Sequence, residues 1–193
     1  TAKRLGFRVD GRGADGGSYT VLGDAHETRM RDTWLLPSVL PPFVSRTPFL
    51  QDSSGFNLLA RREFRLGGGS SISLQGWYAH SHLNAQSLVE EKRDTGDIDI
   101  QHRFKAGAHE VIWGANYRHS SDATTGSSFV NLQPANRRLS WASLFAHDEW
   151  TLVPERLRLM VGARLERDSY SGTSFQPNAR LAWTPNTETT FWG

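Results

Sequence analysis

The chain has 193 residues, of which 37% are apolar and 22% are charged, with a formal net charge of +2. This small charge and the scattered basic residues argue against a nucleic-acid partner. No apolar run approaches the roughly 18–20 residues of a transmembrane helix, and the absence of cysteine excludes a disulfide framework and thiolate metal sites.

The sequence alternates between apolar and polar residues over many stretches, as β-strands do. No segment combines a helical period with capping residues. In chain order, strands are expected at 4–10, 18–25, 55–66, 71–83, 93–105, 109–120, 139–152, 156–167, 176–183 and 188–192.

The connections between these strands alternate in length. Turns rich in glycine, proline or asparagine occur at 67–70, 106–108, 153–155 and 184–187, and 11–17 belongs with them. The other links, at 26–54, 84–92, 121–138 and 168–175, are longer and polar or proline-rich. Short turns at one edge of a sheet and long loops at the other are typical of outer-membrane barrels.

Each strand has one apolar and one charged or polar face. Ile98, Ile100 and Phe104, for example, oppose Asp97, Asp99, Gln101 and Arg103. A soluble antiparallel sheet would also show this alternation. Loop asymmetry and strands of about 9–11 residues favour a barrel in a membrane. Tryptophans near strand ends, which mark membrane interfaces, point the same way: Trp77, Trp113, Trp150 and Trp183.

Two places do not fit this pattern directly. Arg62 shares the apolar face of its strand, where a charge at mid-bilayer would cost about 2–4 kcal/mol. It must lie near a rim, or the register there is different. The register of 139–152 also stays open, because Trp141 and Phe145 compete with Leu144 and Trp150 for the apolar face.

Several stretches resemble the barrel of TonB-dependent outer-membrane receptors. The most specific is Gln176–Asn186, and the likeness spans nearly the whole chain. Weaker matches are at 57–61, 97–104, 109–114, 144–150 and 156–166. The resemblance implies a barrel of about 22 strands filled by a plug domain. It also implies import of ligands such as ferric siderophores or cobalamin, with energy relayed by TonB.

We therefore expect residues 1–193 to form one domain: an all-β, partial up-and-down antiparallel transmembrane barrel with short periplasmic turns and long extracellular loops. The start at Thr1 and the end at Gly193 suggest a piece of a longer protein, with plug and C-terminal strands absent. The expected partners are outer-membrane lipid, TonB through the plug of the parent protein, and a small ligand such as a metal chelate.

Three motifs could carry chemistry, and each has a simpler interpretation. Gly11–Gly16 matches G-x-G-x-x-G but precedes a strand instead of a helix, which indicates a flexible turn. His80 and His82 could share a metal but lack a third ligand in the sequence pattern, and Asp97 and Asp99 extend into a hydrated polar face. We therefore expect no catalytic residues, no cofactor and no metal site.

The link at 26–54 is the best candidate for ligand contact, since it carries cationic and aromatic residues among prolines. Such groups suit anionic or aromatic ligands. The candidate residues are Arg29, Arg31, Trp34 and Phe43, with Phe49 nearby. The alternative is a shielding loop that touches no ligand. Two rival functions stay open: a passive porin, and a soluble all-β carbohydrate-binding or adhesion domain.

Overall fold

The computed structural model describes residues 1–86 and 88–193, which form ten strands. In this part of the chain, no helix is long and apolar enough to cross a membrane. The strands are β1 Ala2–Arg12, β2 Ser18–Pro37, β3 Val44–Leu66, β4 Ser70–Ala85, β5 Val89–Ala106, β6 His109–Thr125, β7 Asn136–Val153, β8 Leu157–Asp168, β9 Gly172–Asn186 and β10 Thr189–Trp192.

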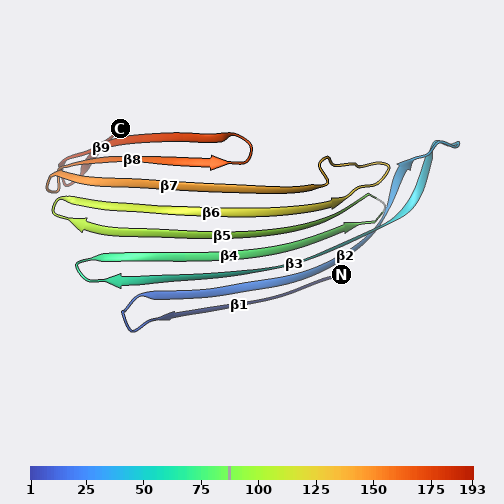
Figure 1. Cartoon of the computed structure of the whole chain (residues 1–193), viewed down its shortest axis with the longest axis horizontal. Coiled ribbons are helices and arrows are strands. Elements are labelled where there is room, and N and C mark those ends of the chain that lie inside the picture. The colour runs from blue at the N-terminus through green and yellow to red at the C-terminus, as the bar shows by residue number, and fades with distance from the viewer. Residues whose placement is uncertain (87) are drawn as a thin grey trace.

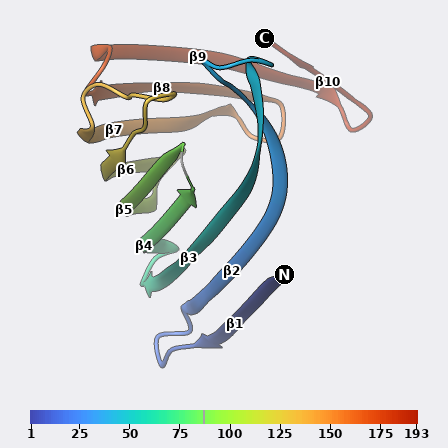
Figure 2. The ribbon, with the colours of Figure 1, turned by 90° about the vertical axis from the view of Figure 1, so that its right-hand side faces the viewer.

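The strands form a single sheet in which each pairs antiparallel with its sequence neighbours, in the order β1 to β10. Figure 1 shows this meander from the side, with hairpin ends at both edges. Viewed end-on, the sheet curves like part of a cylinder and stays open between β1 and β10 (Figure 2). The up-and-down, partial-barrel prediction is therefore confirmed.

All ten expected strands are present, but the four expected long loops were predicted wrongly in extent. Most of 26–54 belongs to β2 and β3, which are joined only at 38–43. The link expected at 84–92 is a connection at 86–88, and its residue 87 lies outside the described residues. The link expected at 121–138 spans only 126–135, and the one expected at 168–175 spans only 169–171. The asymmetry between the two edges therefore comes mainly from paired strand residues in places where loops were expected.

The sheet has almost no buried hydrophobic core, since only Phe49, Ala85 and Ala182 are buried apolar residues among those described. One face, called here the outer face, carries exposed apolar side chains: Leu5, Phe7, Leu58, Leu74, Ile98, Tyr117, Leu144, Leu165 and Leu181. A water-soluble sheet would bury this surface against a second layer. A bilayer in contact with the outer face meets the same need.

The opposite face, called here the inner face, is polar. One cross-strand row of it runs through Arg61, Gln75, Asp99, Asn116, Ser143 and Glu166. The buried polar residues Asp97, Ser120 and Ser143 also lie on this face. In a curved single-layer sheet, side chains crowd together on the concave side. The polar face holds the buried side chains, so it is the concave face and lines the interior.

Arg62 lies at the rim of the short turns, as its placement on the outer face requires. Its guanidinium pairs with the Asp15 carboxylate and donates to the Gly17 carbonyl oxygen at 3.0 Å. It also lies 4.9 Å from the centre of the Phe64 ring. The turn that supplies these partners is the glycine-rich 11–17 segment, where Gly16 has φ +74°. This segment is therefore a turn, as predicted.

The strand register of β7 resolves the competition left open by the sequence. Leu144 and Trp150 lie on the outer face, and Phe145 lines the inner face beside Ser143. Trp113, Trp150 and Trp183 form part of an outer aromatic band near the short turns, where Trp183 stacks on Phe191. Trp77 was wrongly assigned to this band, because it points to the inner face.

Candidate functional site

The inner face of β4, β5 and β6 holds a tightly bonded polar cluster. The Asp97 carboxylate, only 3% exposed, accepts a hydrogen bond from Arg118 Nε at 2.9 Å and two from Asn116 Nδ2 at 3.2 Å. The Arg118 guanidinium lies 5.3 Å from the centre of the Trp77 ring. A charged group held by this many partners is fixed in position, so it offers a rigid polar surface to whatever fills the interior.

Two hollows flank this cluster on the inner face. One of about 400 Å³ is lined by polar side chains of β3 to β6, among them Arg61, Gln75 and Asp99. The other, of about 560 Å³, runs on to β9 and includes Arg164 and Asn178. Charged and amide groups here present both donors and acceptors, as a surface that contacts a folded polypeptide or a hydrated ligand does.

The β2–β3 hairpin extends beyond the other hairpins at the edge opposite the short turns (Figure 1). Seen end-on, its outer part bends away from β1 and rises to the height of β9 (Figure 2). Pairing between the two strands is continuous from Tyr19↔Arg62 to Pro37↔Val44. We call the part from Glu27 to Ser54 the arm.

Because the strand pairing is uninterrupted, the inner and outer faces of the sheet continue along the arm. Trp34 and Phe49 continue the inner face, and their rings stack with centres 4.0 Å apart. Phe49 is 4% exposed, which makes it one of the most buried apolar residues described. Arg29 lies on the opposite side, where it donates from Nε to Asp52 at 2.8 Å.

The four residues predicted for ligand contact therefore do not form one cluster. Arg29 and Arg31 share the outer side of the arm, whereas Trp34 lies on its inner side. Phe43 lies in the tip turn, 61% exposed, with a φ of +67°. A bulky side chain seldom adopts positive φ, and such outliers concentrate at functional positions.

The tip of the arm is uncharged from 33 to 45. It exposes apolar side chains that include Leu35, Val39, Leu40 and Phe43. The turn is closed by two backbone hydrogen bonds, from Ser38 N to Phe43 O at 2.9 Å and from Phe43 N to Leu40 O at 2.7 Å. Exposed apolar side chains gathered in this way are typical of contact surfaces.

His80 and His82 are each brought against a carboxylate of β5. His80 Nδ1 lies 2.8 Å from Asp94 Oδ1, and His82 Nε2 lies 2.9 Å from Glu90 Oε1. Across residues 1–86 and 88–193, no three His, Asp or Glu side chains come together as metal ligands. The two histidines therefore contact separate carboxylates near the edge opposite the short turns.

Sequence inspection missed the Asp97–Arg118–Trp77 cluster and the inner position of Phe49. The cluster joins residues of three strands, and only the register brings them together. The signal that could have indicated it is the placement of Trp77 among Ser73, Gln75 and the other polar residues of its strand. A tryptophan on a polar face needs a polar or cationic partner there.

Two solved structures of siderophore receptors have a fold similar to that of this sheet. The siderophore receptor PirA from Pseudomonas aeruginosa is 15% identical and covers 96% of this chain with a TM-score of 0.63. The ferric preacinetobactin receptor BauA from Acinetobacter baumannii is 10% identical and covers 99% with a TM-score of 0.64. The chain spans only 39% and 38% of these two proteins, respectively. At these identities the likeness concerns the fold.

Sequence comparisons identify the family. The iron-regulated outer membrane virulence protein of Vibrio cholerae is 31% identical over 77 residues, which is 40% of this chain and 12% of that protein. The family described as TonB dependent receptor-like, beta-barrel, matches residues 4–193. Because that match covers nearly the whole chain, the protein belongs to the β-barrel family of TonB-dependent receptors of the Gram-negative outer membrane.

Proposed function

We propose that the chain is part of the wall of an active importer that takes up a scarce ligand, such as a ferric siderophore or cobalamin, with energy relayed by TonB. The observation that carries this proposal is the family match over residues 4–193. The parent protein would supply the remaining strands, a plug and the TonB contact, because the chain spans 39% of the siderophore receptor PirA. Among the alternatives, iron chelates are favoured by the names of the relatives.

The polar inner face suits a barrel that is filled by a plug domain. Asp97, Arg118 and Asn116 form a rigid network, with hollows of about 400 and 560 Å³ beside it. A plug can seat its own polar groups in such hollows. The lack of a buried apolar core among the described residues also disfavours a soluble carbohydrate-binding or adhesion domain.

The arm is the proposed ligand-contact element. Trp34 and Phe43 offer aromatic surface, and Arg29 and Arg31 offer charge on the other side. An aromatic or acyl part of a chelate would contact the inner side and the tip. An anionic part would reach the arginines only at the edge of the arm.

Uptake of radiolabelled ferric siderophores by cells carrying the full-length receptor would test the function. Uptake that requires TonB and stops when the proton gradient is collapsed supports active import. Uptake that continues without TonB would show a passive channel instead. A direct signal-to-barrel junction in the upstream coding sequence, without a plug, would also contradict active import.

Binding assays on the same receptor would test the arm. Trp34→Ala and Phe43→Ala are expected to weaken ligand binding by about tenfold or more, the usual effect of removing an aromatic anchor. Thr33→Ala, on the outer side of the same arm, serves as the matched control. If the aromatic variants bind like the control, the arm is a shielding loop.

A further inference from the structure

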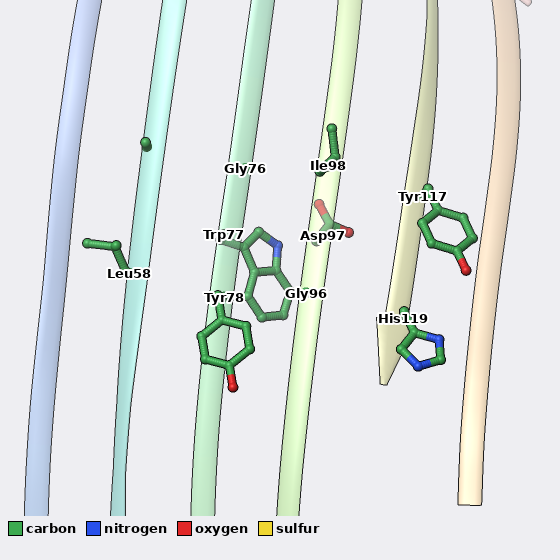
Figure 3. Close-up of a pocket in the computed structure, with 10 residues that line it drawn as sticks. Leu58, Gly76, Trp77, Tyr78, Gly96, Asp97, Ile98, Tyr117 and His119 are labelled. Carbon is green, nitrogen blue, oxygen red and sulfur yellow. The ribbon is translucent and has the colours of Figure 1, made fainter. Parts of the chain in front are cut away.

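A hollow of about 490 Å³ interrupts the outer face where β3, β4, β5 and β6 meet. Its floor is made of small residues, Ala60, Gly76 and Gly96, and the close-up in Figure 3 shows larger side chains around them. A Cβ atom added at Gly96 would meet nothing within 4 Å, and one at Gly76 only a backbone oxygen at 3.7 Å. The glycines therefore leave real space on a surface that faces lipid.

The walls of the hollow change from apolar to polar along the strands. Ala60, Gly76 and Ile98 form the row nearer the middle of the sheet, which ends at Tyr117, and Leu58 begins the next row. Towards the long-hairpin edge, Tyr78 and His119 lie in one cross-strand row with Gly96 between them (Figure 3). Two strand spacings separate the Cα atoms of this pair by roughly 10 Å, wide enough for a chain to pass over the glycine.

Hydrogen-bonding groups of both kinds crowd the polar end. The Tyr78 hydroxyl donates to Asp94, which also lies 2.8 Å from His80 Nδ1. His119 is exposed and has no hydrogen-bond partner within residues 1–86 and 88–193. A set that contains a carboxylate, a phenol and two imidazoles suits hydroxyl groups, which both donate and accept, better than it suits phosphate alone.

We propose that this hollow binds one acyl chain of a glycolipid of the extracellular leaflet, with the sugar headgroup of that lipid bonded at Tyr78, His80 and His119. The family places the outer face in the outer membrane, where lipid is the medium that covers it. The order of the walls, apolar inside and hydrogen-bonding at the extracellular end, matches the orientation of a lipid in that leaflet. A volume near 500 Å³ lies within the range of small-ligand sites, about 300–1,000 Å³.

Native mass spectrometry of the detergent-purified full-length receptor would test the site, with rough lipopolysaccharide and phosphatidylethanolamine as the two probes. The wild type is expected to retain lipopolysaccharide preferentially. Gly96→Leu fills the hollow and is expected to lower that retention about tenfold. Gly76→Leu provides a second filling variant. Ala179→Leu, which adds similar bulk on the outer face of β9, is expected to retain lipid like the wild type.

His119→Ala and Tyr78→Phe test the headgroup contact separately, since they leave the floor intact. They are expected to abolish the preference for lipopolysaccharide. Equal retention of lipopolysaccharide by both leucine variants and the wild type would overturn the site, and so would equal retention of both lipids by the wild type. A receptor dimer that Gly96→Leu dissociates would show instead that a second copy covers the hollow.

Discussion

The assignment of the apolar face to lipid makes a quantitative prediction at Ile98. This side chain is 61% exposed on the outer face of β5, between His102 near the short turns and Asp94 near the other edge. An arginine there would lie about 13 Å along the strand from the Asp94 position, too far for an ion pair. Ile98→Arg should therefore cost about 2–4 kcal/mol of unfolding free energy, which is roughly a 30- to 700-fold change in the folding equilibrium.

Equilibrium unfolding of the full-length receptor in phospholipid vesicles, followed by tryptophan fluorescence, would measure this cost. Gln101→Arg is the matched control, because Gln101 lies on the inner face of the same strand and bonds to Asp99 at 3.1 Å. It should change stability by about 0.5 kcal/mol or less. If the two arginines cost the same, Ile98 does not face lipid. If Gln101→Arg costs more, the faces have been assigned the wrong way round.

Three further predictions concern charged groups. Asp15→Asn should destabilise the receptor by about 1 kcal/mol, because Arg62 loses its partner at the rim, and adding Arg62→Gln should recover most of it in a double-mutant unfolding cycle. Asp97→Asn should cost about 1.5–3 kcal/mol by the same unfolding assay, since it weakens the bond to Arg118. Hydrogen bonds to the Asp168 carboxylate, first from the Ser171 hydroxyl, hold its pKa below the usual range. The stability it adds should therefore be present above the unfolded pKa of about 3.9 and be lost as pH falls through the folded pKa; an Asp168 carboxyl NMR titration midpoint at or above 3.9 would contradict this.

The number of strands and their faces could be predicted because the bilayer imposes a strict period of two. Ile98 and Leu144 lie on the face assigned to lipid, and Asp99 and Ser143 lie on the inner face. The sequence of each strand therefore indicates which side is apolar and which is polar. The Arg62 anomaly was also predictable as a rim position. Its partner, Asp15, was not, because 47 residues separate them and the contact depends on how the glycine turn folds back.

The arm could not be predicted because its surroundings differ from those of the wall. Past Ala25 on β2, the outer side carries Glu27, Arg29 and Arg31, so the alternation that marks a membrane strand stops. The backbone hydrogen bonds of β2 and β3 continue regardless, up to Pro37↔Val44. A polar, proline-rich sequence therefore looked like a loop although it is paired strand. Strand pairing also explains why the predicted ligand residues lie apart. It fixes Arg31 and Trp34 on opposite sides of the arm, whereas a flexible loop would have allowed them to come together.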